Sequence, residues 1–242
     1  MARAAGAAEG SRAGSADAAF AGFGAGALAF LRALGFYQDR AWFQENRAVY
    51  ESELRLPLAA LVADLSLVLE RCGLPLSGDP RRALFRINRD IRFARDKSPY
   101  NTHVSAALTR GGAKRAPGAL YLHFAPEGCF AAAGFWHPEP AELARLRGAI
   151  LGDPRGFAAL ERALARRGLA LARADALKRL PRGFERVSDA RIAEALRLRS
   201  LTVHRDLPEE MVFRPALVGQ IADFAAAAMP LLRFGWAALA AG

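Results

Sequence analysis

Between Leu84 and His103 the chain reads LFRINRDIRFARDKSPYNTH, and in this stretch the spacing of apolar residues becomes twofold. Four of the five odd positions from 85 to 93 are apolar, whereas the even positions from 86 to 92 carry Arg, Asn or Asp. Alternation of this kind is typical of a strand with one buried face and one polar face. The stretch therefore predicts a strand over 84–93 and marks the start of a sheet.

Three further strands are expected directly after this stretch, over 103–109, 119–125 and 129–136. The Pro-Glu-Gly tripeptide at 126–128 is a turn sequence, so the last two of these strands should form a hairpin. Strands joined by so short a turn run antiparallel. A short extended segment near 200–206 is expected farther along the chain.

Apolar residues at helical spacing flank the strands on both sides. Helices are predicted over about 24–35, from Asp39 to Gly73 with a kink or break at Pro57, and over about 139–151, 154–168, 189–198 and 215–230. Helices, then a run of strands, then helices indicate an α+β fold. We expect an antiparallel sheet of about four to five strands, with N-terminal and C-terminal helices packed on it.

The chain is expected to divide into a leader and one domain. Residues 1–18 are a mixture of Ala, Gly and Ser with scattered charges, which predicts a disordered leader and not a signal peptide. Residues 19–242 should form a single α+β domain. No apolar run approaches the roughly 18 residues needed to span a bilayer, because Asp223, Pro230 and Arg233 interrupt the longest one. We therefore expect a cytoplasmic protein with no membrane partner.

The formal net charge of +10 invites a nucleic-acid partner. Only Lys97, Lys114 and Lys178 are lysines among the 34 basic residues, so nearly all of the positive charge is arginine. Such a bias, together with abundant Ala and Gly, is what a biased coding genome produces without any partner. The basic residues are also spread along the chain, which favours a solvated surface for most of them.

The predicted strand over 84–93 has a polar face. Residues two apart on a strand point the same way and lie about 6.5–7 Å apart, so Arg86, Asn88, Asp90 and Arg92 should form one row. Arg89 falls on the apolar side, where a charge is costly without a partner. A bulge or a buried partner is therefore expected at Arg89.

Beyond this strand the chain adds an ammonium, a phenol and an imidazole. Guanidinium and ammonium groups beside a hydroxyl and an imidazole suit a phosphate or a carboxylate. The predicted anion-binding residues are Arg86, Arg89, Arg92, Lys97, Tyr100 and His103, with Asp90 and Asp96 as supporting carboxylates. The competing interpretation is a lattice of Arg–Asp salt bridges that joins the sheet to the helices.

The same residues leave a reaction open. Asp90 and Asp96 could hold a hydrated Mg²⁺ against a phosphate, or Lys97, Tyr100 and His103 could move protons. The chain has no recognisable Ser/His/Asp or Cys/His nucleophile pattern and no histidine spacing of a zinc site, so no metal site is predicted and the cofactor is unknown. His103 and His123 could meet across the sheet, where structural histidines are the simpler interpretation.

Four stretches of the chain resemble a family of conserved hypothetical proteins, mostly bacterial with fungal members. They are Arg40-Ala-Trp42-Phe43 with Asn46, Arg47 and Tyr50; Phe85 to Phe93 continuing through Asp96-Lys97-Ser98-Pro99-Tyr100; Tyr121 through Gly134 to Trp136 and Pro138; and Leu177-Lys178-Arg179 with Pro181, Gly183 and Phe184. The resemblance covers about residues 20–212. The family usually has paired asparagines where this chain has Tyr37-Gln38, and tends to have lysine at Asn101. It implies no established activity.

Three functional hypotheses follow from these residues. The first is an anion site on a sheet for a phosphorylated small molecule or a nucleotide, with an enzyme acting on it left open. The second is a nucleic-acid-binding module, which a steep salt dependence would distinguish. The third is a structural or partner-binding protein in which the Arg–Asp row is only a lattice.

Overall fold

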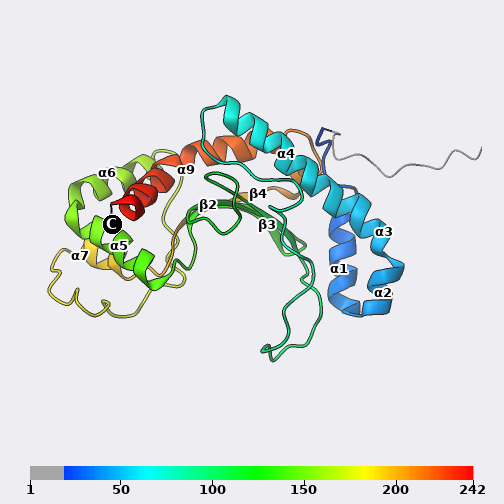
Figure 1. Cartoon of the computed structure of the whole chain (residues 1–242), viewed down its shortest axis with the longest axis horizontal. Helices are drawn as coiled ribbons and strands as arrows, with labels where there is room; N and C mark the ends of the chain where they lie inside the picture. The colour runs from blue at the N-terminus through cyan, green and yellow to red at the C-terminus, as the bar shows by residue number, and fades with distance from the viewer. Residues whose placement is uncertain (1–18, 242) are drawn as a thin grey trace, which may run out of the picture.

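The structure, a computed structural model, describes residues 19–241. The chain forms an antiparallel sheet of four strands in the order β1-β2-β3-β4, with helices before and after the first three strands (Figure 1). The strands are β1 Val104–Thr109, β2 Ala119–Ala125, β3 Gly128–Phe135 and β4 Leu201–Leu207. The predicted α+β class and four of the predicted extended segments are confirmed. The predicted leader, residues 1–18, lies outside the described residues.

The β2–β3 hairpin has the expected turn. Ala125 pairs with Gly128, so Pro126 and Glu127 are the two residues of the connection. β4 then pairs antiparallel with β3, and Leu201 lies opposite Phe135. The C-terminal part of the chain therefore completes the sheet that the central meander begins.

The helices lie where apolar residues recur at helical spacing. They are α1 Ala27–Tyr37, α2 Arg40–Glu45, α3 Arg47–Tyr50, the π-helix η1 Glu51–Arg55, α4 Leu56–Arg71, α5 Pro140–Gly152, α6 Pro154–Ala165, α7 Ala190–Leu196, α8 Glu209–Val212 and α9 Leu217–Ala240. Asp39, the predicted start of the second helix, caps α2, since its side chain accepts a hydrogen bond from the backbone N–H of Trp42. The π-helical stretch directly precedes Pro57, whose ring would clash with the carbonyl of an ideal preceding turn.

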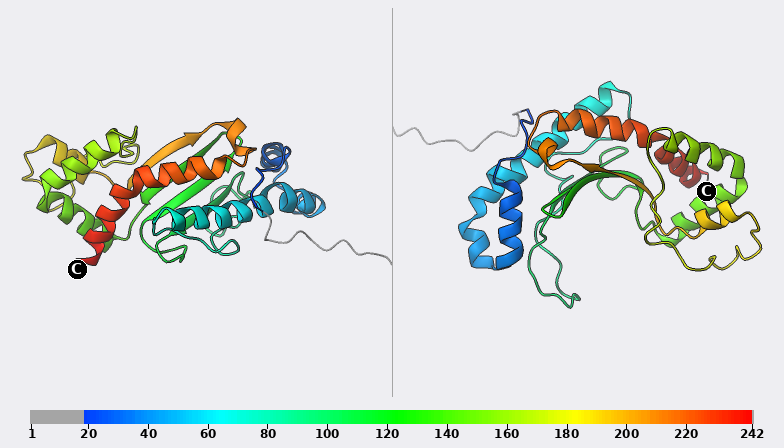
Figure 2. Two further views of the ribbon diagram at one scale, coloured as in Figure 1. Left: turned by 90° about the horizontal axis from the view of Figure 1, so that it is seen from above. Right: turned by 180° about the vertical axis from the view of Figure 1, so that it is seen from behind.

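One face of the sheet is covered and the other is open. α4 and α9 pack against each other and on the sheet, and within residues 19–241 no helix lies over the opposite face (Figures 1 and 2). The covered face is apolar and carries Leu108, Leu120, Leu122, Phe124, Ala131, Ala133 and Val203, all at most 1% exposed. The molecule therefore has the outline of an arch, with the open sheet face on its inner side.

Helix α9 continues ten residues past the predicted end at Pro230. It bends along its length (Figure 2), and Pro230 gives the reason because proline removes one helical hydrogen bond. Beyond the bend the apolar residues Leu231, Leu232 and Trp236 remain buried. Gly235 allows close approach there, since a Cβ atom would lie 2.1 Å from the ring of Phe135. Burial after the proline therefore outweighs the lost hydrogen bond.

The same helix is long and apolar enough to cross a membrane by length and composition, with a mean hydropathy of 1.3 over 18 residues. This differs from the expectation that charges and proline would interrupt every such run. However, 56% of that window is buried inside the protein, against β3, β4 and neighbouring helices. Such packing is typical of the core helix of a globular domain.

Residues 84–93 do not form the predicted strand. The stretch from 84 to 103 instead folds back on itself as an irregular arm, which projects below the sheet in Figure 1 and is called the arm from here on. Only isolated bridges occur in it, between Leu84 and Ala106 and between Asn88 and Tyr100. The predicted apolar side is also mostly exposed, since Phe93 is 96% exposed and only Ile87 is buried.

A change of register explains the irregularity. The N–H of Phe85 donates to the carbonyl of Ser105, whereas the N–H of Asn101 donates to the carbonyl of Ile87. Between these two bonds Arg86 alone lies on one side of the arm and three residues, 102–104, lie on the other, which leaves Thr102 and His103 as extra residues in a bulge. Bulges re-aim side chains next to sites, and this one separates the arm from β1.

The other end of the arch is built by α5, α6 and α7 (Figure 1). Between α6 and α7 the chain follows a long loop, and residues 176–189 of it are called the basic loop from here on. The loop region is held by two backbone hydrogen bonds, from Ala172 to the carbonyl of Thr202 and from Leu177 to the carbonyl of Arg197.

Candidate functional site

The base of the arm is fixed to the N-terminal helices. Gln38 ends α1 in a left-handed conformation, and its side-chain amide makes two hydrogen bonds to the backbone of Tyr100, of 3.1 Å from Nε2 and 3.0 Å to Oε1. The ring of Tyr100 is 3% exposed and stacks on Phe43 with centroids 4.5 Å apart. The amide that this chain has at Gln38 thus positions the arm.

A polar cavity of about 350 Å³ lies where the arm meets the end of α1. It is lined by Gly35, Gln38, Arg89, Asp96, Ser98, Tyr100, Asn101, Thr102 and His103. Three of the six predicted anion-binding residues, Arg89, Tyr100 and His103, therefore surround one cavity, together with Asp96.

Arg89 has an ionic partner, whereas the sequence predicted a bulge or a buried partner at this position. Its guanidinium Nη1 forms a salt bridge with Asp96, which is exposed and not buried as expected. Asp96 also accepts hydrogen bonds from the hydroxyl and the N–H of Ser98, at 2.6 and 2.9 Å. The Ser98 hydroxyl and then Arg89 hold the pKa of Asp96 well below its usual range. The carboxylate is therefore charged and orients the guanidinium.

The other predicted residues lie elsewhere on the arm. Arg92 pairs in a bidentate manner with Asp90, at 2.7 and 2.9 Å, and both side chains are exposed. The ammonium of Lys97 donates to the carbonyl of Ile91 at 3.0 Å. Arg86 is exposed and has no carboxylate within 4.0 Å among residues 19–241. The prediction of a straight row of four polar side chains is wrong, because a bulged arm replaces the regular strand.

A row of rings crosses the open face of the sheet beside the cavity. His103 lies 4.4 Å from His123 between ring centroids, and His123 stacks on Phe130 at 4.7 Å with an interplanar angle of 19°. His123 and Phe130 are directly opposite each other in the β2–β3 pairing. The predicted meeting of the two histidines across the sheet is confirmed. His103 lines the cavity as well, so it links the cavity to the ring row.

Both imidazoles are kept neutral by their surroundings. Burial, and then the neighbouring His103, lower the pKa of His123 to about 4. Burial also lowers the pKa of His103. Tyr121 Oη is hydrogen bonded to Nδ1 of His123 at 3.2 Å. A neutral imidazole can donate one hydrogen bond and accept another, so the pair is suited to a polar ligand near pH 7.

Several residues of this surface were missed from sequence. Tyr121 and Phe130 share a sheet face with His123, and the alternation of positions in the hairpin was the available signal. Lys114 lies 4.7 Å above the ring of Phe85 and donates to the carbonyl of Leu84 at 2.9 Å. Lys114 borders one side of the surface through this cation–π contact with Phe85. No local sequence pattern predicts a contact between residues so far apart in the chain.

Among the described residues, no group of three or more His, Cys, Asp or Glu side chains is arranged to hold a metal ion. The donors at the cavity are guanidinium, imidazole, hydroxyl and amide groups, and Asp96 is engaged with Arg89 and Ser98. Such a set favours an anion over a cation.

These features define a class of α+β protein: helices cover one sheet face, and the other carries a polar cavity beside a row of rings. Within this class the chain belongs to the DUF2461 family, described as conserved hypothetical protein, which matches residues 26–234. The family resemblance found in the residues is confirmed, and the match extends into α9. No curated protein and no solved structure matches the chain.

Proposed function

We propose that the inner side of the arch binds a phosphate-bearing small molecule, best a nucleotide. The phosphate would contact Arg89, Thr102 and His103 in the cavity, and the base would lie on the ring of Phe130. The observation that carries this proposal is the position of His103, which borders the cavity and also begins the ring row. A nucleotide needs the same adjacency of an anion site and a stacking surface.

The cavity has the donors that a phosphate requires. Arg89 carries five N–H donors, and its salt bridge with Asp96 leaves others free for a ligand. His103 is neutral and supplies an N–H or a lone pair. The arm also holds five basic and two acidic residues, so an approaching anion meets a net charge of +3.

The ring row offers a place for a base. His103, His123 and Phe130 follow one another at spacings typical of stacked rings, and Phe130 is only half-buried. The next residue across the sheet is Asp206 on β4, which is exposed. Its carboxylate could accept a hydrogen bond from a base amine or a ribose hydroxyl. The row therefore ends where one more ring would fit.

A thermal-shift and calorimetric titration of the full chain with AMP, ATP and inorganic phosphate tests the proposal. A nucleotide at 100 times its dissociation constant should stabilise the wild type by about 2.7 kcal/mol. Arg89→Gln should lose this stabilisation, measured against its own ligand-free melting temperature. Arg95→Gln is the matched control, because Arg95 is an exposed cation of the same arm outside the cavity.

Equal ligand-induced shifts in the two variants would contradict the cavity as the phosphate site. The absence of any shift in the wild type with all three ligands would contradict the proposal as a whole. A shift with phosphate alone, and no gain from the nucleoside, would retain the anion site and remove the stacking role of Phe130.

A further inference from the structure

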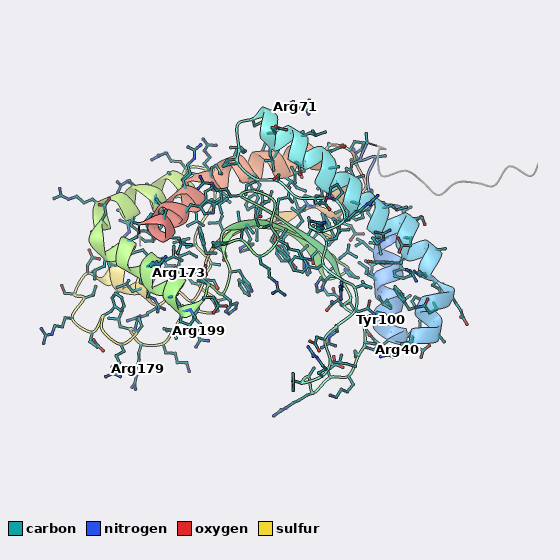
Figure 3. All side chains as sticks on the ribbon, in the orientation of Figure 1. Arg40, Arg71, Tyr100, Arg173, Arg179 and Arg199 are labelled. Atoms are coloured by element: carbon teal, nitrogen blue, oxygen red, sulfur yellow. The ribbon has the colours of Figure 1, made fainter. Side chains whose placement is uncertain are left out.

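The net charge of the chain is concentrated in two segments at opposite ends of the arch. The arm carries +3, and residues 166–199, with ten basic and four acidic side chains, carry +6 of the total of +10. Figure 3 shows Tyr100 at one end of the arch and Arg179 and Arg199 at the other, with the open sheet face between them. The two ends therefore present positive charge on both sides of the same surface.

The four cations of the basic loop form no salt bridge in the described part of the chain. Lys178, Arg179, Arg182 and Arg186 have no carboxylate within 4.0 Å among residues 19–241. The nearby acids are engaged in other ways. Asp189 caps α7 through the N–H groups of Arg191 and Ile192, Glu185 accepts from the N–H of Gly183, and Asp175 accepts from the hydroxyl of Ser200. The positive charge of this loop is thus available to a ligand.

Strand β3 connects the two basic ends with a distinctive open face. Phe130, Ala132 and Gly134 alternate on that face, and Trp136, which is 69% exposed, continues the same alternation directly after the strand. The two aromatic positions are therefore separated by about 20 Å of extended chain, and the residues between them on this side of β3 are small. The spacing suits a polymer that places flat rings at intervals along a strand.

We propose that the ligand of this inner surface is a single-stranded nucleic acid. Its bases would stack on Phe130 and Trp136, and its phosphates would contact the arm at one end and the basic loop at the other. This inference rests on the proposed nucleotide site, which becomes one end of the path. A single strand is favoured over a duplex because only unpaired bases can lie on aromatic side chains.

Fluorescence anisotropy of the full chain with a labelled oligo(U) of about 15 nucleotides tests the inference over a range of salt concentrations. The logarithm of the affinity should fall steeply with the logarithm of the salt concentration, because each phosphate contact contributes about −0.7 to the slope for a single strand. Arg179→Gln should make the slope shallower by about that amount. Arg71→Gln, at the end of α4 on the outer side of the arch (Figure 3), should leave the slope unchanged.

The aromatic contribution is measured separately. Trp136→Ala removes an exposed ring and should weaken oligo(U) by about tenfold or more without changing the salt slope. A duplex of matched length should bind more weakly than the single strand. Polyglutamate should not displace the oligonucleotide at equal charge concentration.

Equal effects of Arg179→Gln and Arg71→Gln, or displacement by polyglutamate, would overturn the inference, the latter in favour of an acidic protein partner. No oligonucleotide binding at low salt, with the AMP-induced shift intact, would overturn this inference and leave the proposed nucleotide site standing. Oligonucleotide binding that survives Arg89→Gln unchanged, without any AMP shift, would retain the polymer path and remove the cavity from it.

Discussion

The arm and the basic loop are both rich in charge, but they use it in opposite ways. In the arm three of the five cations are engaged: Arg89 pairs with Asp96, Arg92 pairs with Asp90, and Lys97 donates to a backbone carbonyl. In the basic loop both acids, Glu185 and Asp189, accept hydrogen bonds from backbone N–H groups, and the cations have no carboxylate within 4.0 Å among residues 19–241. The density of charged residues in a sequence therefore does not reveal where free charge lies. Whether a charge is free depends on the contacts that its side chain makes in the folded protein.

The two regions also differ in how they are anchored, and a stability comparison should show it. Tyr100→Ala removes a buried ring stacked on Phe43 and should cost about 3 kcal/mol of unfolding free energy. Phe184→Ala in the basic loop removes a partly buried ring and should cost about half as much. Chemical denaturation of both variants measures the difference, with Tyr100→Phe as a control that keeps the stack. Equal losses would mean that the loop is as firmly anchored as the arm.

Acid should destabilise the fold through His123, whose ring lies beside His103 of the arm. The pKa of His123 is about 4 in the folded protein and about 6.5 when unfolded, so the unfolded chain takes up the proton first as the pH falls. Stability is therefore fully present above pH 6.5 and should decline as the pH falls to 4, by roughly 2 kcal/mol once about 3 kcal/mol is reduced for solvent screening of the partly buried imidazole. Denaturation at several pH values measures this slope. His123→Gln should flatten it, and an unchanged slope in that variant would assign the acid sensitivity to another group.

The smallest expected effect comes from the most conspicuous ion pair. Arg92 and Asp90 are exposed on the arm, where salt screens such a pair and ordering the side chains costs entropy. Arg92→Ala should therefore leave the melting temperature unchanged within error at low and high salt. A clear loss of stability would revive the hypothesis that the Arg–Asp residues are a structural lattice.

Most of the fold could be predicted from local patterns. Twofold alternation and the turn at 126–128 gave the β2–β3 hairpin, and helical spacing located α1, α5 and α6. The sequence predicted a strand in the arm because apolar and polar residues alternate there. Such alternation indicates two faces of different polarity, but it does not show that the backbone pairs with a neighbouring strand. Two extra residues, Thr102 and His103, shift its register, and that shift depends on pairing across about 15 residues of chain. Helix α9 was predicted too short because tertiary burial after Pro230 is not a local signal.

The candidate site was predicted in part for the same reason. Arg89, Tyr100 and His103 do surround one cavity, but the salt bridge of Arg89 with Asp96 requires the arm to reverse direction. The basic loop has no apolar periodicity, so the sequence predicted no site there, and Lys178 and Arg179 entered only through the family resemblance. The helix predicted from residue 189 does begin with a cap at Asp189, and the predicted helix start is the local hint that an acid there is occupied.

Both outer edges of the sheet are protected against adding a strand from a second molecule. The free side of β1 is met by short bridges from Ser77 and Leu84. The free side of β4 carries Arg205 and Asp206 among its exposed or half-exposed residues, and charges on an edge oppose pairing. A chain with 52% hydrophobic residues thereby hides the backbone groups from which aggregation would start. Both borders of the sheet therefore oppose edge-to-edge association with a second molecule.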